Sequence, residues 1–142
     1  NLYGPGQKME ESSHVIPAAI KKCNDVSMGL SDHISIWGTG DSTREFLYID
    51  DAVDAIMKAI QLGTGTYNVG SGRPISINDL YDLIMDIMGG KGAIILHDLS
   101  HPDGQSSRLL DSTIFNTNFN YVASTSLRCG LEKTIESYRH LQ

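Results

Sequence analysis

The segment at residues 75–90, ISINDLYDLIMDIMGG, constrains the fold more than any other part of the chain. Ser76 and Asp79 have the S-x-x-D spacing of a capping box, and Ile75 and Leu80 have the spacing of a hydrophobic staple. Apolar residues then recur with helical periodicity at Leu80, Leu83, Ile84, Ile87 and Met88. Gly89-Gly90 closes the pattern. The segment therefore predicts a helix with one buried face.

A second helix is predicted near the start of the chain. Ser12 or Ser13 is a candidate cap, and the apolar pattern runs to about Met28. Proline is tolerated only in the first turn of a helix, so Pro17 requires a start close to His14.

Helical patterns also follow acidic or hydroxyl residues at three places later in the chain. Asp50 and Asp51 are good caps for a helix over 50–62, Asp111 precedes a short helix, and Ser126 caps the last one. The apolar face of the 50–62 helix holds Val53, Ile56, Met57 and Ile60. The stripe of the last helix holds Leu127, Leu131, Ile135, Tyr138 and Leu141.

Short apolar runs between these helices predict strands at residues 34–37, 44–49, 66–69 and 93–96, the last of them buried. Residues 97–110 are predicted to be mostly loop. Alternation of the two kinds of element indicates an α/β fold with about four helices and short mixed strands.

Composition excludes several classes of protein. The 142 residues suffice for one domain, and the net charge of −6 argues against nonspecific nucleic-acid binding. No apolar run is long enough to span a membrane, and the opening residues do not resemble a secretory signal. Cys23 and Cys129 match no metal or redox spacing, which favours free thiols in the cytoplasm over a disulfide.

Phosphate-binding motifs are incomplete throughout the sequence. The Gly-x-Gly pairs at residues 38–40 and 70–72 lack both the spacing and the strand–helix context of a dinucleotide-binding loop. A self-contained nucleotide-dependent enzyme is therefore not expected. The first residue is Asn1 rather than Met, which suggests either processing or the back part of a longer protein.

Three residues are candidates for chemistry by their type and place. His14, at the start of a helix, is a possible general acid or base, or else a capping or surface histidine. Trp37, the only tryptophan, offers a stacking face for a base or sugar, or else anchors the core. Arg44 suits a phosphate or diphosphate, or else pairs with Glu45 or Asp41.

The segment at residues 97–104, HDLSHPDG, places two histidines near two aspartates. A metal site is possible there, but a polar loop with one or two ligand contacts is favoured because no helix orients His97 and His101. Arg108 offers a second guanidinium that suits a phosphate. Lys22 is typical of a solvated helix face.

In their order along the chain, NLYGPG, SHVIPA, WGTG, REFLYIDD, YNVGSG, ISINDL, HPDG and RLLD resemble the carboxyl-terminal part of extended short-chain dehydrogenase/reductases, the NAD-dependent epimerase/dehydratase family. The N-x-Y-G-P and R-E-F pieces are shared by many nucleotide-sugar enzymes. SHVIPA and PDG…LLD are narrower, and with them the chain is most similar to the GDP-L-fucose synthase subfamily.

The resemblance implies a cytoplasmic enzyme with an amino-terminal Rossmann domain for NADP and a smaller substrate domain. Residues 1–142 would be the substrate-binding portion, and residues 1–6 a remnant of the junction with the cofactor domain. The parent enzyme would convert GDP-4-keto-6-deoxymannose to GDP-fucose. The chain alone would be inert, because the Rossmann motif, the Y-x-x-x-K pair, the catalytic serine and the partner cysteine belong upstream.

The resemblance also implies roles for individual residues. His14 matches the residue that works with a cysteine in epimerisation, and with Asn1 and Leu2 it lies beside the nicotinamide half of the cofactor. Cys23 cannot replace that cysteine by position. The residues implied to bind the GDP-sugar are Lys22, where the family usually has Arg, Trp37, Arg44, Asp103 and Arg108, the last near the diphosphate. No metal is implied.

Two alternatives remain open. One is a stand-alone nucleotide-sugar binding module, and the other is part of a different nucleotide-sugar epimerase or 4,6-dehydratase. In the favoured interpretation, the helix at 50–62 and the strand at 44–49 expose apolar faces. The missing Rossmann domain or a second copy of the chain would cover them.

Overall fold

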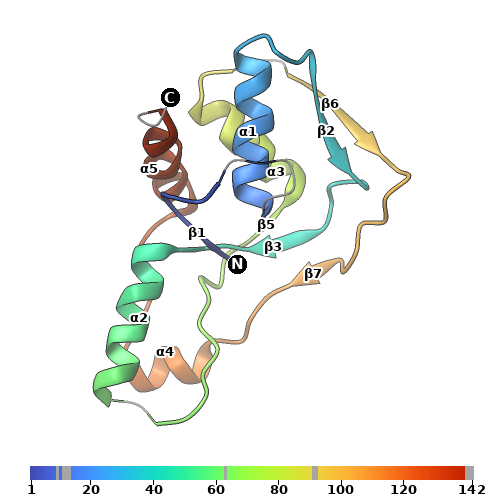
Figure 1. The fold of residues 1–142 in the computed structure, drawn as a ribbon. Coiled ribbons are helices and arrows are strands. Elements are labelled where there is room, and N and C mark those ends of the chain that lie inside the picture. The colour runs from blue at the N-terminus through green and yellow to red at the C-terminus, as the bar shows by residue number, and fades with distance from the viewer. Residues whose placement is uncertain (9, 11–13, 63, 91–92, 140–142) are drawn as a thin grey trace.

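The computed structural model describes residues 1–8, 10, 14–62, 64–90 and 93–139. The helices are α1 (Val15–Ser27), α2 (Ile49–Leu62), α3 (Ile77–Ile87), α4 (Thr113–Phe119) and α5 (Leu127–Arg139). The strands are β1 (Leu2–Tyr3), β2 (His33–Trp37), β3 (Thr43–Glu45), β4 (Leu47–Tyr48), β5 (Pro74–Ser76), β6 (Ile94–Asp98) and β7 (Ser107–Arg108). Figure 1 shows α1, α3 and α5 grouped at one end of the molecule, with α2 and α4 at the other.

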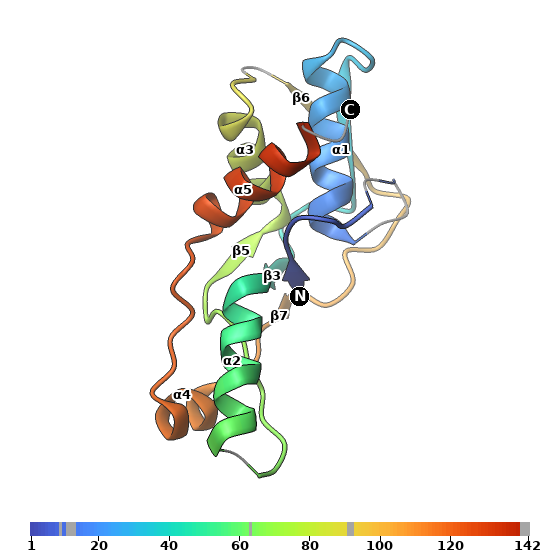
Figure 2. The same cartoon turned by 60° about the vertical axis from the view of Figure 1, so that its left-hand side comes forward.

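The strands form three small sheets. In the first, β1 pairs in parallel with β4, and in the second, β2 pairs in parallel with β6, so that Trp37 stands opposite Asp98. In the third, β3 lies between β5 and β7, with Arg44 opposite Ile75 on one side and Arg108 on the other. The third sheet bridges the two ends of the molecule (Figure 2).

Two hydrophobic clusters correspond to these two ends. The larger cluster joins α1, α3 and α5, and its fully buried residues include Ile20, Leu80 and Leu131. The smaller cluster is an aromatic group between α2 and α4, in which Phe115 and Phe119 pack with rings 4.5 Å apart. The fold matches the predicted mixed α/β class.

The helix predicted from residues 75–90 is confirmed as α3. Ser76 Oγ accepts a hydrogen bond of 3.0 Å from the Asp79 backbone N–H, as a capping residue should. Leu80 and Ile84 are fully buried. At the last helix, Ser126 Oγ accepts a hydrogen bond of 3.2 Å from the Cys129 N–H, which agrees with its predicted capping role.

The predicted start of α1 close to His14 is confirmed, since His14 is the residue that precedes the first helical turn. The candidate caps Ser12 and Ser13 lie outside the described residues. Pro17 is the third residue of the helix, in the first turn as expected.

The prediction of one continuous strand at residues 44–49 is wrong. Arg44 and Glu45 pair within the third sheet, whereas Leu47 donates a backbone hydrogen bond of 2.8 Å to Asn1 in the first. The chain thus changes sheets at Phe46, and α2 begins at Ile49. The aspartates at 50 and 51 therefore lie within the first turn of the helix instead of capping it.

Two other strand predictions are also corrected. Residues 66–69 form no strand, and the ring of Tyr67 packs edge-on against Phe115 and Phe119 in the aromatic cluster. The last strand, β6, extends to Asp98 and is largely exposed rather than buried. Ile94 and Leu96, which share one face of the strand, are 60% and 49% exposed, so this face is left without a covering layer.

The predicted exposure of apolar faces is half right. On α2, four apolar side chains are exposed by 48–72%: Val53, Ile56, Met57 and Ile60. Phe46, Leu47 and Tyr48 are instead buried, because the segment crosses between sheets through the interior. In the part of the chain that the structure describes, no helix is long and apolar enough to cross a membrane.

Candidate functional site

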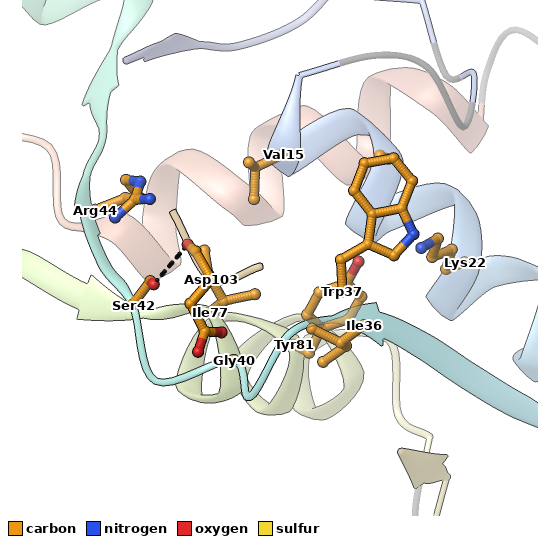
Figure 3. Close-up of a pocket in the computed structure, with 11 residues that line it drawn as sticks. Val15, Lys22, Ile36, Trp37, Gly40, Ser42, Arg44, Ile77, Tyr81 and Asp103 are labelled. Carbon is orange, nitrogen blue, oxygen red and sulfur yellow. Dashed lines mark hydrogen bonds between the residues drawn. The ribbon is translucent and has the colours of Figure 1, made fainter. Parts of the chain in front are cut away.

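A cavity of about 230 Å³, here called the upper cavity, lies beside α1 (Figure 3). Its lining comes from α1, the end of β2, the turn after it, β3, α3 and the loop after β6: Val15, Ala18, Lys22, Ile36, Trp37, Gly40, Ser42, Arg44, Ile77, Tyr81 and Asp103. The lining thus includes four of the five residues predicted to bind the GDP-sugar.

The turn after β2 is held by a carboxylate. Asp103 Oδ1 accepts a hydrogen bond of 2.6 Å from the Thr39 N–H, and Ser42 Oγ donates to the Asp103 carbonyl at 3.0 Å. Gly38 has φ of +70°, and a Cβ there would collide with the Asp103 carboxylate. Only glycine therefore permits this approach, which brings Asp103 to the cavity wall.

Arg44 is half-buried, and backbone carbonyls accept part of the hydrogen bonds that its guanidinium can donate. Its Nη1 donates to the carbonyls of Thr43 at 2.7 Å and Gln105 at 2.8 Å. Neither predicted acidic partner holds it: Glu45 faces inward, where it accepts hydrogen bonds from the N–H groups of Gly72 and Leu110. The guanidinium is anchored through one nitrogen, and Arg44 lines the cavity, where a guanidinium suits an anionic ligand.

Trp37 and Lys22 lie toward the other end of the cavity from Arg44 in Figure 3. Trp37 is 65% exposed, so it does not anchor the core. Lys22 Nζ donates to the Ser35 carbonyl at 2.7 Å, which keeps the cation beside the strand that carries Trp37. The two basic side chains and the indole are chemically suited to a nucleotide with its phosphates.

The residues predicted to lie beside the cofactor group around a second cavity of about 230 Å³ that includes Asn1, Leu2 and His14 in its lining. His14 precedes α1, and its imidazole is exposed and makes no capping hydrogen bond, so the ring is not used to start the helix. Val15 lines both cavities. The two predicted sets of residues therefore adjoin at the amino end of α1.

Arg108 is the one residue predicted to bind the GDP-sugar that does not line the upper cavity. It is exposed on β7, next to Arg44 in register, and its Nε donates to Gln105 Oε1 at 3.2 Å.

The two histidines of the 97–104 segment have separate partners. His97 Nε2 is 3.0 Å from Asn78 Oδ1, and His101 Nδ1 is 3.1 Å from Asp98 Oδ2. Within the described residues, no group of three or more histidine, cysteine or acidic side chains is arranged to hold a metal ion.

Sequence reasoning missed Asn78, Ile77 and Tyr81, which α3 contributes to the site. Asn78 Nδ2 donates to the Thr39 carbonyl at 3.0 Å, and so fixes the turn from the side of α3. Tyr81 lies one helical turn after Ile77, a spacing that could have placed both on one face. Tyr81 is 5% exposed, and burial raises the pKa of its hydroxyl.

Comparison with known proteins places the chain in a class. The model of the NAD dependent epimerase/dehydratase family matches residues 1–70, and the chain belongs to this family. Among curated relatives, it is similar to the GDP-L-fucose synthase of Sinorhizobium fredii, with 40% identity over 97% of this chain and 44% of that protein. It is also similar to the GDP-L-colitose synthase of Yersinia pseudotuberculosis, with 36% identity over 97% of this chain and 46% of that protein.

The fold agrees with this grouping. The structure of RMD from Pseudomonas aeruginosa complexed with NADPH superposes with a TM-score of 0.87 at 23% identity, covering 100% of this chain and 47% of that one. The chain thus spans less than half the length of each of these three proteins.

Proposed function

We propose that this chain forms the substrate-binding part of an NADP-dependent epimerase-reductase that acts on a GDP-keto-sugar, as in conversion of GDP-4-keto-6-deoxymannose to GDP-fucose. One observation carries the proposal. Lys22, Trp37, Arg44 and Asp103 belong to three separate stretches of the chain and line one cavity. Both curated relatives compared above carry names of enzymes that make a GDP-sugar, which supports GDP as the nucleotide.

In the proposed complex, Trp37 would stack on the base at one end of the upper cavity, with Lys22 as a basic substrate contact beside it. Arg44, toward the other end, would neutralise the diphosphate. Arg108, one strand away from Arg44, would meet the phosphates from outside. Held at its nucleotide, the sugar would reach past Val15 toward the second cavity, where His14 lies.

His14 would then move protons on the sugar. A ketone at C4 acidifies the hydrogens on C3 and C5, so an acid/base pair can remove a proton from one face of the sugar and deliver one to the other. His14 would be one member of this pair, and its partner cysteine would belong to the upstream part of the enzyme. The exposed ring of His14, which has no capping duty, is free for this work.

The second cavity also fits a cofactor at its edge. Gln7 Oε1, in its lining, is buried and has no hydrogen-bond partner among the described residues, so an acceptor remains for a polar group of a ligand. Asn1, Leu2 and His14 would contact the nicotinamide half of NADP. When bound, NADPH would supply the hydride that reduces the ketone.

We further propose that residues 1–142 act as one substrate-binding unit, with residues 1–6 at its junction to a cofactor-binding domain. The isolated unit would be inert. Its partners would be the GDP-sugar and, over the exposed face of α2, that domain or a second copy of the chain. A cytoplasmic location accords with two free cysteines.

Calorimetric titration of the chain with GDP tests the nucleotide assignment. We expect saturable binding of GDP and no heat with NADPH. Absence of GDP binding at millimolar concentration, with the fold verified by circular dichroism, would contradict the assignment. For the catalytic role, His14→Asn in the complete enzyme should abolish epimerisation. Retained epimerisation would exclude His14 as the acid or base.

A further inference from the structure

The indole of Trp37 is covered on one side by an imidazole. The ring of His101 lies parallel to it, with centroids 4.4 Å apart and an angle of 5° between the planes. Trp37 lines the upper cavity, but His101 does not. The side of the indole that serves the cavity is therefore not the side that His101 occupies.

Asp98 holds His101 in this position. The Asp98 carbonyl accepts hydrogen bonds from the N–H groups of Gly38 at 3.0 Å and His101 at 3.3 Å. One carboxylate oxygen of Asp98 accepts a hydrogen bond of 2.6 Å from Ser100 Oγ, and the other oxygen lies 3.1 Å from His101 Nδ1. Because Asp98 is also the register partner of Trp37, this turn starts beside the indole and folds back over it.

The far end of the same loop is fastened as well. Asp103, two residues after His101, accepts the hydrogen bond from the Thr39 N–H described above. Residues 98–103 are thus tied to the backbone just after Trp37 at both ends, by Asp98 to Gly38 and by Asp103 to Thr39. The imidazole is placed by the loop and is not a chance contact of one exposed side chain.

We propose that His101 is a positioning residue that clamps Trp37, so that a purine base stacks on the opposite face and forms a layered base–indole–imidazole stack. The inference rests on the proposed function for the identity of the ligand, a guanosine diphosphate. An exposed indole without the clamp would have to be immobilised by the ligand itself, at a cost in affinity. A stacked aromatic pair accounts for about a three- to tenfold change in a binding constant.

The sequence makes the clamp directly observable, because its single tryptophan is Trp37. Without ligand, His101→Ala should lower the fluorescence anisotropy of Trp37 and increase its quenching by acrylamide. His101→Phe retains a stacking ring and should restore both values. His33→Ala is a matched control, since His33 is a surface histidine that pairs with Asp32 at the start of β2 and should leave Trp37 unchanged.

Titration with GDP then tests the ligand arm. His101→Ala should weaken GDP binding about three- to tenfold, and His101→Phe should bind GDP as tightly as the unaltered chain does. Tighter binding by His101→Ala would mean that His101 occupies the face the base needs, and would overturn the clamp. Unchanged anisotropy and affinity would overturn it too.

The two proposals fail in different ways. If the unaltered chain does not bind GDP, the nucleotide assignment and the layered stack fail together. The anisotropy of His101→Ala and His101→Phe would still decide whether His101 immobilises the indole.

Discussion

The carboxylate of Asp103 binds the backbone N–H of Thr39 at 2.6 Å, across 64 positions of the chain. This contact joins the loop after β6 to the turn after β2, and so closes one wall of the upper cavity. The shape of the candidate nucleotide site therefore depends on a charge that also lines it.

Replacement of Asp103 should damage the site without unfolding the protein. Asp103→Ala removes the acceptor for the Thr39 N–H, and we expect about tenfold weaker GDP binding in calorimetry, since hydrogen bonds to charged groups are worth about 1.5–3 kcal/mol. Asp111→Ala is the control, because this aspartate also accepts a backbone N–H but lies away from the upper cavity. Equal effects of the two substitutions would refute the role.

Arg44→Lys tests whether the planar guanidinium of Arg44 binds the phosphates. Lysine keeps the charge but lacks the planar fork that offers paired N–H donors to a phosphate, so we expect about tenfold weaker GDP binding. Guanosine, which lacks phosphates, should bind both forms alike. Arg128→Lys alters a surface ion pair with Asp86 and should change the binding of neither GDP nor guanosine. A similar loss for guanosine would assign Arg44 to the base or the fold.

Glu45 is expected to be structural. It is 2% exposed, and its carboxylate accepts N–H hydrogen bonds from Gly72 at 2.7 Å and Leu110 at 3.4 Å. Glu45→Gln should lower the free energy of unfolding by about 1–3 kcal/mol, because one amide group poorly replaces two acceptor oxygens. Urea denaturation measures the change, with the exposed Glu136→Gln as a reference that should differ little from the unaltered chain.

Stability should fall in alkali. Burial raises the pKa of the Cys23 thiol from 9.0 to about 12, and burial likewise raises the pKa of Tyr121 to about 12. Between pH 9 and 12 the unfolded chain therefore loses protons that the folded chain keeps. Stability is full below pH 9 and declines as pH rises toward 12.

Urea midpoints measured across this range should show the decline, and Cys23→Ala should make it shallower. The slope should not vanish, because the buried tyrosines titrate in the same direction. An identical slope with and without Cys23 would contradict the assignment.

The apolar face of α2 should drive association. Ile56 and Ile60 are 56% and 72% exposed on one helix, so the chain should sediment as dimers or larger species at micromolar concentration. Ile56→Glu with Ile60→Glu should return it toward the monomer. Leu30→Glu alters an equally exposed aliphatic residue, after α1, and should not. A monomeric unaltered chain would rule out self-association through this face.

Local sequence determined much of the helical structure. The cap at Ser76 and the buried positions of α3 followed from short-range spacing, because helical hydrogen bonds and periodic burial involve residues within a few positions of each other. The exposed face of α2 was predictable for the same reason. Motif order along the chain was sufficient to indicate the family.

Tertiary structure decided what short-range spacing does not encode. Asp51 has the local signature of a helix cap, but it is 3% exposed, and its carboxylate accepts the N–H groups of Ser124 and Thr125. Residues 44–49 have the pattern of one strand, yet they divide between two sheets because their partners lie elsewhere in the chain.

The meeting of Trp37 with His101, and of Thr39 with Asp103, has the same origin. Such contacts join residues more than sixty positions apart, and they form only where the packing of whole elements brings them together. The residue types of the candidate site are therefore set by the amino-acid sequence. Their shared cavity is a property of the folded chain.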